Sequence, residues 1–421
     1  MNPHTHAHVQ RLQVTLGDQS VGMLAMAPKG AIVFEYSTDW IAHGFDIAPK
    51  SLAFNTQPQL AKSPLFGGLH GVFNDSLPDG WGLLLMDRAL GQRMGWARQH
   101  ITPLDRLAYM GTRAMGALGY APEMDTAPIE DTVNLAQLAA SVEQVLAGDT
   151  AEVLAQLRIQ GGSPGGARPK VTVALSDKPD THNTLDACLS GFNDLPAGYA
   201  HWIVKFRSAQ DPIDMGRAEK AYADMAGLAG VHMPNTALRQ VQVGSSTEDF
   251  FSVRRFDRDA NLRHHVITMA GLYYADFKTP CMDYRDLLGA TSLITRDVRQ
   301  VERAFRWMVF NVLAHNKDDH AKNFAFIHTL QGWQLSPAYD LTFSHGMGQE
   351  HTTAVLGHGN PGPQEMLQLA ANFQIPHAAE IIAQTVDAVA HWPELARANG
   401  VGRALTNEIQ SALAIIAQRF I

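Results

Sequence analysis

The sequence predicts an α+β protein in which a small, β-rich N-terminal subdomain precedes a two-lobed core with an all-helical C-terminal lobe. Two observations predict this class. Apolar residues alternate in short runs within residues 11–36 and again between residues 171 and 256, whereas helical apolar spacing dominates after residue 265. The chain has 421 residues and is 46% hydrophobic, which suffices for two or three cores. We expect domains at 1–125, 126–260 and 261–421.

Composition excludes several classes of protein. The formal charge of −8 argues against a large non-specific nucleic-acid surface, which needs a lysine- and arginine-rich face. No run reaches the roughly 18 uncharged apolar residues of a membrane span, so we expect a soluble, cytoplasmic protein. Cys188 and Cys281 lack the spacing of a zinc site or a disulfide scaffold, and we expect two buried, inert thiols.

The N-terminal subdomain follows from period-two patterning. Residues 11–36 place apolar side chains at alternate positions between glycine-containing turns, which predicts a small antiparallel sheet. The segment 71–82 then leads into a helical run through Met86 and Leu90. Pro78 and Asp79 are placed there as turn and cap residues.

The core is read from the order of its elements. Helical spacing between 134 and 157 precedes a glycine cluster at 161–166. A five-stranded small lobe fits the strands and helix that follow, at 171–175, 201–206, 216–229 (helix), 236–243 and 249–256. A long apolar run starting at Val298 predicts a buried helix. Strands are expected at 324–328 and 332–335, and helices at 364–374, 378–392 and 402–418.

Residues 161–170 form the first candidate functional segment. Glycines directly before a strand let successive backbone N–H groups approach phosphate oxygens. The segment matches neither a P-loop nor a GxGxxG motif, and glycine clusters also occur as plain linkers. Arg168 and Lys170, however, add cations that a linker does not require.

Lys205 is the second candidate, because it interrupts an otherwise apolar strand. Such a lysine must either reach solvent or meet an anion. Glu219, at the start of the following helix, is the candidate partner. In protein kinases a strand lysine holds the α- and β-phosphates and is oriented by a helix glutamate.

The third and fourth candidates are carboxylates beyond the long helix. Asp318 and Asn323 have the D-x-x-x-x-N spacing of a kinase catalytic loop, in which the aspartate accepts the proton of the attacking hydroxyl and the asparagine holds magnesium. Asp340 follows a predicted strand pair and is the natural second metal ligand, although no DFG motif is present. A solvated turn and a cap aspartate are the respective alternatives.

In combination these motifs resemble the HipA-type serine/threonine kinases, the toxin half of bacterial toxin–antitoxin pairs. The resemblance covers nearly the whole chain. Leu77-Pro-Asp-Gly-Trp-Gly82 and Met86-Asp-Arg88 are similar to that family's N-terminal domain. Its kinase core is matched by four motifs: 202–206, 255–258, 319–323 and 337–340.

The resemblance implies a role for each matching residue. Asp318 would be the catalytic base, and Asn323 and Asp340 the magnesium ligands. Ser163 matches a serine that the family autophosphorylates, which inactivates the kinase. The implied ATP-binding residues are Gly165, Gly166, Ala167, Arg168, Lys170, Lys205, Arg254, Phe256, His320 and Lys322.

The resemblance also implies cofactors and partners. ATP and Mg²⁺ would be the cofactors, and the substrate a protein, which in known members is an aminoacyl-tRNA synthetase. A small helix-turn-helix antitoxin similar to HipB would restrain the kinase and carry it to DNA, with no membrane involved. Two alternatives remain: a small-molecule phosphotransferase, against which the segment 77–82 argues, and a catalytically silent partner of a repressor, which has no chemical need for Lys205, Asp318, Asn323 and Asp340 together.

Overall fold

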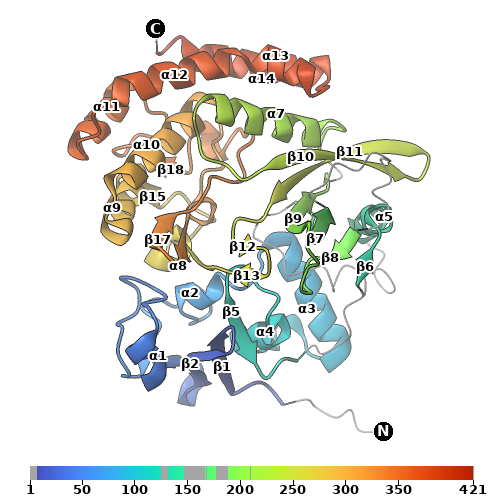
Figure 1. Ribbon diagram of the computed structural model, residues 1–421, viewed down its shortest axis with the longest axis vertical. Coiled ribbons are helices and arrows are strands. Elements are labelled where there is room, and N and C mark those ends of the chain that lie inside the picture. The colour runs from blue at the N-terminus through green and yellow to red at the C-terminus, as the bar shows by residue number, and fades with distance from the viewer. Residues whose placement is uncertain are drawn as a thin grey trace.

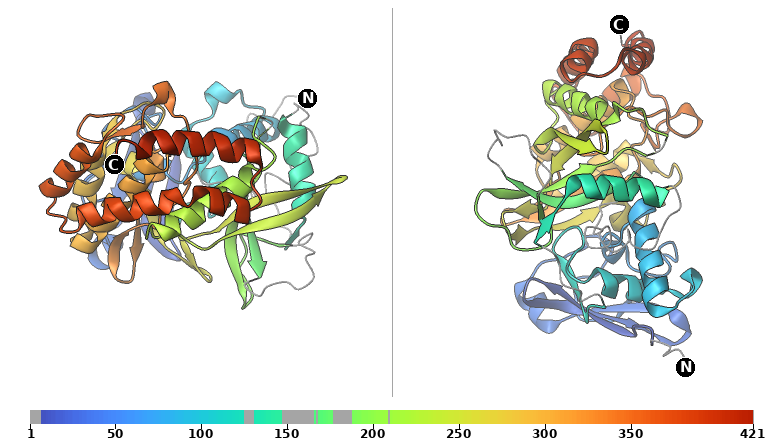
Figure 2. Two further views of the ribbon diagram at one scale, coloured as in Figure 1. Left: turned by 90° about the horizontal axis from the view of Figure 1, so that it is seen from above. Right: turned by 90° about the vertical axis from the view of Figure 1, so that its right-hand side faces the viewer.

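The computed structural model describes residues 7–124, 131–146, 166, 168–176, 188–208 and 210–420. Its elements are stacked in three tiers along the longest axis (Figure 1). The N-terminal sheet forms one end and the last helices form the other, with a mixed tier between them, as the side view in Figure 2 shows. The predicted α+β class, with a small N-terminal subdomain ahead of a two-lobed core, is confirmed.

The N-terminal subdomain is a five-stranded antiparallel sheet in the order β4-β3-β2-β1-β5. Alternation works as the sequence predicts, since Leu12 and Val14 of β1 are completely buried. The sheet is completed by β5, which lies far from β1 in sequence. Its strands are β1 (Arg11–Leu16), β2 (Gln19–Met26), β3 (Ile32–Tyr36), β4 (Gln59–Leu60) and β5 (Leu118–Ala121); its helices are α1 (Thr38–His43), α2 (Gly71–Asn74), α3 (Gly80–Met94) and α4 (Pro103–Met110).

Helices α2 and α3 join this subdomain to the core. Gly71 of α2 lies so close to Gly271 that a Cβ atom there would stand 2.0 Å from the Gly271 carbonyl oxygen. Trp81 and Leu85 of α3 pack into the same apolar cluster as Trp202 of the core sheet. Truncating a buried tryptophan of this kind to alanine typically costs about 3–5 kcal/mol.

The first core lobe contains a six-stranded sheet in the order β10-β11-β9-β7-β8-β6. The expected strands and the helix 216–229 are present, and their ends differ from the expected ones by at most three residues. The expected number of five strands was too low, because the short strands β6 and β8 extend the edge of the sheet. The elements are β6 (Thr132–Val133), α5 (Leu135–Leu146), β7 (Lys170–Ser176), β8 (Cys188–Ser190), β9 (Tyr199–Lys205), α7 (Met215–Leu228), β10 (Thr236–Val243) and β11 (Ser246–Arg254).

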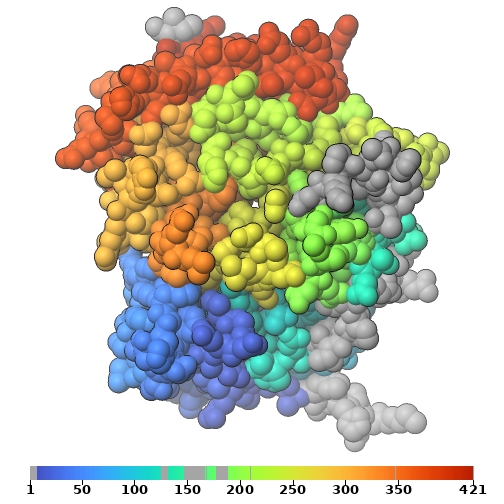
Figure 3. All heavy atoms as spheres, in the orientation of Figure 1, coloured from blue at the N-terminus to red at the C-terminus, as the bar shows by residue number. Residues whose placement is uncertain are grey.

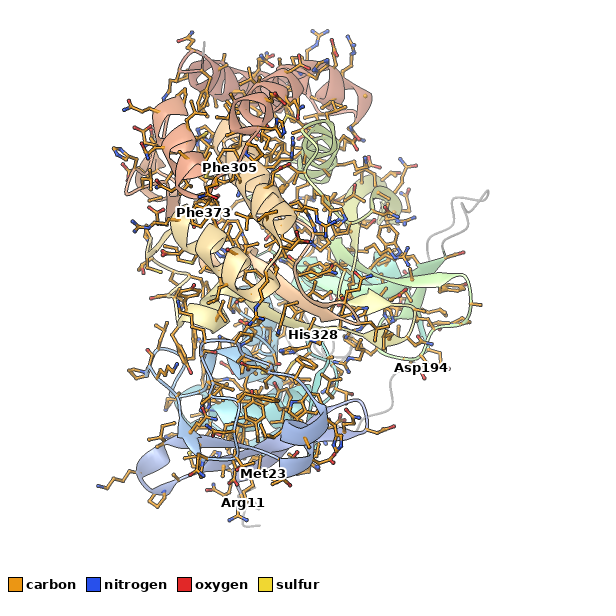
Figure 4. All side chains as sticks on the ribbon, turned by 60° about the vertical axis from the view of Figure 1, so that its left-hand side comes forward. Arg11, Met23, Asp194, Phe305, His328 and Phe373 are labelled. Carbon is orange, nitrogen blue, oxygen red and sulfur yellow. The ribbon has the colours of Figure 1, made fainter. Side chains whose placement is uncertain are left out.

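The second lobe is dominated by helices, but it also contains strands, whereas an all-helical lobe was expected. A three-stranded sheet, β14-β16-β17, faces the N-terminal subdomain, and Figure 4 labels His328 of β16 at that boundary. The strands are β12 (Arg258–Asp259), β13 (Leu262–Arg263), β14 (His265–Thr268), β15 (Met282–Asp283), β16 (Ala325–Thr329), β17 (Gly332–Leu335) and β18 (Thr353–Ala354). The helices are α8 (Met269–Tyr273), α9 (Tyr284–Thr295), α10 (Val298–Leu313), α11 (Pro363–Asn372), α12 (Ala378–Ala390), α13 (Trp392–Ala398) and α14 (Arg403–Ala417).

Helix α10 is the buried helix that the long apolar run predicts. Asp297 caps it by accepting a 2.9 Å hydrogen bond from the Arg299 amide. Its side chains are buried at helical spacing from Val301 onward, whereas Val298 remains 83% exposed because it precedes the packed turns. Phe305, labelled in Figure 4, lies at the centre of this packing.

The surface corrects one further expectation. Cys188 is buried, but Cys281 is exposed.

The space-filling view in Figure 3 shows the N-terminal subdomain and the terminal helices on opposite sides of the middle tier. None of the helices in the described part of the chain has the length and apolar character that a membrane span requires.

Candidate active site

Strand alternation places the side chains of Lys170 and Lys205 on the same face of the first-lobe sheet. Trp202 and Val204 of β9 face the cluster around α5, so Ile203 and Lys205 face α7. Lys170 pairs directly with Lys205 across β7 and β9 and shares that face. Like charges in this position repel each other, so the pair requires nearby carboxylates.

Glu219 and Asp340 supply these carboxylates. Lys205 Nζ donates a 2.8 Å hydrogen bond to Glu219 Oε2 and also contacts Asp340 Oδ1. Burial opposes the charge of Lys205, but Asp340 and Glu219 outweigh it and raise the pKa of the ammonium. Burial likewise opposes the charge of Asp340, yet Lys205 and Lys170 hold its pKa well below the usual range. Lys205 and Asp340 are therefore both charged at neutral pH.

Arg168 adds a third cation to this network. Its guanidinium donates a 2.9 Å hydrogen bond to Glu219 Oε1 and a 3.2 Å hydrogen bond to Asp211 Oδ1. Glu219 is thus shared between Arg168 on the glycine-rich segment and Lys205 on β9. Burial lowers the pKa of Arg168, but the charge of Glu219 raises it, and the pKa is raised overall. The arrangement ties the end of the glycine-rich segment to α7.

The two adjacent aspartates after α10 have opposite environments. The Asp318 side chain is 61% exposed, whereas that of Asp319 is completely buried. Asp319 accepts hydrogen bonds from Tyr284 Oη (2.7 Å) and the Thr352 amide (2.8 Å), and it pairs with His351 Nδ1 at 2.9 Å. Asp319 therefore fastens the segment to the lobe and leaves Asp318 facing outward.

Asn323 and His320 lie next to Asp318. The Asn323 side-chain amide donates a 2.7 Å hydrogen bond to the Asp318 carbonyl. His320 Nε2 lies 3.8 Å from Asp318 Oδ1. Partial desolvation and then the charge of His320 act in opposite directions on the Asp318 carboxyl, and its pKa is raised overall, with Asp340 and Asp319 contributing to the rise.

An apolar cleft lies between the two lobes, beside these charges. It holds about 1110 Å³ of space, its open mouth included. Phe256 stacks on Tyr339 at its wall, with ring centroids 5.4 Å apart at 28°. The lining residues are Asp75, Leu77, Met115, Lys170, Ile203, Lys205, Met233, Pro234, Phe251, Val253, Arg254, Arg255, Phe256, Val266, Thr268, His320, Lys322, Asn323, Tyr339, Asp340 and Leu341. Size and lining suit a planar, partly apolar ligand with a charged tail.

The segment that connects the lobes is held by buried ion pairs. Arg255 Nη2 lies 2.7 Å and Arg258 Nη1 2.6 Å from Asp257 Oδ2, and Asp257 is fully buried. The Gly116 amide donates a 2.8 Å hydrogen bond to the same carboxylate, so the N-terminal subdomain shares in the network. Arg255 and Arg258 of the motif 255–258 therefore have a structural role.

A second, more open space adjoins the cleft and shares Lys170, Lys205, His320 and Asp340 with it. Asp318 lines this space together with Gly166 and Arg168. Three residues of the N-terminal subdomain also line it, namely Asp79, Gly80 and Leu83.

The structure thus brings together ten of the residues selected from the sequence: Gly166, Arg168, Lys170, Lys205, Glu219, Asp318, His320, Lys322, Asn323 and Asp340. Arg254 and Phe256 line the apolar cleft. Gly165, Ala167 and Ser163 lie outside the described residues. Sequence reasoning missed Asp75, Asp79, Asp319 and Tyr339 as contributors. The last three carried a signal, because they lie within the motifs 77–82, 319–323 and 337–340.

Comparisons with known proteins agree with this architecture. The family profile described as HipA-like C-terminal domain matches residues 162–392, and that of the HipA N-terminal domain matches residues 12–121. A Shewanella oneidensis protein, named serine/threonine-protein kinase toxin HipA, is 23% identical over 78% of this chain and 74% of its own length. Y4dM of Sinorhizobium fredii, named for an inferred kinase activity, is 30% identical over 41% of this chain; the match spans 46% of that relative.

A solved structure shows the same fold. The Shewanella oneidensis complex of HipA, HipB and operator DNA matches with a TM-score of 0.68 and 16% sequence identity, covering 97% of each chain. Both domain profiles together span most of the chain, and the C-terminal profile alone spans more than half of it. The chain therefore belongs to the HipA-type serine/threonine-protein kinase toxin family.

Proposed function

We propose that this chain is an ATP- and Mg²⁺-dependent serine/threonine protein kinase that acts in the cytoplasm as the toxin of a toxin–antitoxin pair. One observation carries the proposal: Lys205 is bound by both Glu219 and Asp340 at the junction of an apolar cleft and an open space lined by Asp318. An adenine fits the cleft, and the phosphates would then extend past the lysines toward Asp318.

The residues divide the work of phosphoryl transfer. Lys205, Lys170 and Arg168 offset the phosphate charge. Asp318 accepts the proton of the substrate hydroxyl as that oxygen forms a bond to the γ-phosphorus. The bond from the γ-phosphorus to the β,γ-bridging oxygen breaks at the same time, and ADP leaves. The raised pKa of Asp318 makes it a better proton acceptor.

The oxygen donors suit magnesium. A kinase metal site needs one or two carboxylates together with phosphate oxygens and water. Asp340 supplies a carboxylate, and Asn323 keeps its amide oxygen for a metal because its amide nitrogen is bonded to Asp318. No three histidine, cysteine, aspartate or glutamate side chains converge within the described residues. When bound, Mg²⁺ neutralises and orients the phosphates.

The exposure of Asp318 supports a protein as the phosphate acceptor. A side chain that is 61% exposed at the open end of the site can be reached by a serine or threonine on a large partner. By family membership we propose an aminoacyl-tRNA synthetase as the class of target and Ser163 as the site of autophosphorylation. A phosphate there would add about −1.5 to −2 charges beside the phosphate-binding segment and oppose ATP binding.

We propose a helix-turn-helix antitoxin similar to HipB as the partner that restrains the kinase. The Shewanella oneidensis HipA was solved with HipB and operator DNA, and this chain has the same fold. The net charge of −8 supports contact with DNA through the partner only.

The test is phosphate transfer from labelled ATP and Mg²⁺, with the protein alone and with a panel of aminoacyl-tRNA synthetases, followed by mass spectrometry. We expect phosphate on Ser163 or on one synthetase. Asp318→Asn is the control, because it removes the base without opening a cavity, and it should lower transfer by roughly 10²–10⁴-fold while ATP still binds. Transfer near the wild-type rate in this variant contradicts the role of Asp318, and absence of ATP binding to the wild type contradicts the kinase.

A further inference from the structure

Asp79 is the N-cap residue of α3, but its side chain does not cap that helix. Its backbone is extended, as an N-cap residue requires, yet its carboxylate accepts no hydrogen bond from the described first turn of α3. An aspartate at this position normally accepts such a bond and stabilises the helix by about 0.5–2 kcal/mol. The side chain is only 12% exposed, so its charge must be satisfied by other groups.

The carboxylate of Asp79 contacts both lobes of the core. One oxygen accepts a hydrogen bond from the Gly166 amide in the glycine-rich segment of the first lobe. The other lies 3.1 Å from Lys322 Nζ in the catalytic segment of the second lobe. Burial alone would raise the pKa of Asp79, but Lys322 and the Gly166 amide lower it, so the group is ionised.

The segment that carries Asp79 is held firmly in place. Asp75 accepts hydrogen bonds from the Thr268 amide (2.7 Å) and the Thr268 hydroxyl (2.8 Å) of the second lobe. Trp81 is buried in the core of the first lobe. Asp79 lies between these two anchors, and a rigid segment can hold a carboxylate to within a fraction of an ångström.

Gly166 and Lys322, the two partners of Asp79, also lie next to other residues of the active site. Gly166 lies beside Lys170 and Asp340, since a Cβ atom on Gly166 would be 4.0 Å from Asp340 Oδ2. Lys322 lies 4.4 Å above the ring of Phe277, and its carbonyl accepts a 2.7 Å hydrogen bond from Tyr339 of the cleft wall. A shift of either group would therefore displace groups that face the phosphates.

We propose that Asp79, a residue of the N-terminal subdomain, is a positioning residue for phosphoryl transfer, and that it fixes the Gly166 amide of one lobe against Lys322 of the other. This inference rests on the proposed kinase activity. It makes the N-terminal subdomain part of the active site. Asp79 does not touch the reacting atoms but sets the distance between the phosphate-binding segment and the catalytic segment.

The test compares Asp79→Asn with the wild type in two measurements, the dissociation constant of Mg²⁺–ATP and the kcat of autophosphorylation or transfer. Misplacement by about 1 Å costs up to roughly 100-fold in rate, so kcat should fall by about 10- to 100-fold. Removal of the carboxylate also removes a negative charge beside the phosphates, which offsets the loss of positioning in the ground state. The dissociation constant should therefore stay within about threefold of the wild type.

Asp87→Asn is the matched control. Asp87 lies on the same helix, its side chain is 4% exposed, and it pairs with Arg98 (2.9 Å) and Arg106 (2.8 Å) of the N-terminal subdomain, away from the cleft. Asp87→Asn can destabilise the N-terminal subdomain but does not change the contacts of Gly166 and Lys322. The kcat of folded Asp87→Asn protein should therefore stay near the wild-type value. An equal fall of kcat in the two variants would overturn the inference.

A double variant separates positioning from other effects. If Asp79 acts through Lys322, adding Asp79→Asn to Lys322→Met should lower kcat by clearly less than Asp79→Asn does alone. An unchanged kcat in Asp79→Asn, or additive losses, would overturn the inference. So would much tighter ATP binding without loss of rate, because the carboxylate would then compete with the phosphates. A wild-type protein that binds no ATP would instead contradict the kinase itself.

Discussion

The ammonium group of Lys205 donates a 2.8 Å hydrogen bond to the carboxylate of Glu219, which joins β9 to α7 inside the first lobe. The same carboxylate accepts a 2.9 Å hydrogen bond from Arg168. A single buried glutamate thus aims two cations at the space in which we place the phosphates.

Replacing Glu219 by glutamine should weaken ATP binding. The change removes a charge-assisted partner, worth about 1.5–3 kcal/mol, from two cations that it orients. We expect the dissociation constant of Mg²⁺–ATP to rise by roughly tenfold, measured by calorimetric titration. Glu248→Gln is the control, since Glu248 pairs with Arg207 at 2.9 Å within the same lobe but does not contact Lys205. Equal affinities in the two variants would contradict the orienting role of Glu219.

Replacing Asp340 by asparagine should change the magnesium requirement. Asp340 is the one carboxylate of the proposed metal pair, and asparagine keeps its shape without its charge. The concentration of Mg²⁺ for half-maximal transfer should rise by an order of magnitude or more, and kcat should fall. Transfer rates are measured across a magnesium series. An unchanged magnesium dependence would remove Asp340 from the metal site.

The buried Asp257 should matter for folding more than any surface carboxylate. It is fully buried between Arg255 and Arg258, and breaking such a network leaves buried charges unpaired. We expect Asp257→Asn to lower the free energy of unfolding by about 3–5 kcal/mol. Asp297→Asn breaks the exposed pair with Arg299 but keeps a capping side chain, and should cost less than about 1 kcal/mol. Denaturant titration compares the two, and similar losses would contradict the ranking.

Acid should destabilise the contact between the N-terminal subdomain and the second lobe. His265 Nε2 lies 2.8 Å from the Ile47 carbonyl, and its Nδ1 is buried without a partner among the described residues. Burial lowers the pKa of His265 from 6.5 to about 4. The folded state therefore binds fewer protons than the unfolded state between these values. The contribution of neutral His265 to the free energy of unfolding is fully present above pH 6.5. It is lost as pH falls toward 4, by up to about 1.4 kcal/mol per pH unit.

Thermal unfolding measured from pH 7.5 to 4.5 tests this dependence. His265→Gln keeps a donor for the Ile47 carbonyl but does not titrate, so its melting temperature should fall less steeply with acid. His43→Gln, at an exposed position, is the control and should follow the wild type. A wild-type slope in His265→Gln would show that other groups control the acid sensitivity.

The sequence by itself determined the elements and the chemistry of the catalytic segment. Period-two patterning defined β1 to β3 and the central strands, and helical spacing defined α10, because local side-chain periodicity follows directly from which face is buried. Spacing alone also selected Asp318 and Asn323, since both lie in one short segment. Short strands near the sheet edge, such as β6 and β8, were missed because two or three residues carry no period.

Only the tertiary structure decided which charged residues meet. Asp318 and Asp319 are neighbours with the same side chain, yet one is exposed and the other is fixed by Tyr284 and Thr352, because the chain turns one inward and the other outward. The contact of Asp79 with Gly166 and Lys322 joins three parts of the chain that are distant in sequence. Such contacts depend on how the lobes and the subdomain pack together, which is a property of the whole fold and leaves no local pattern in the sequence.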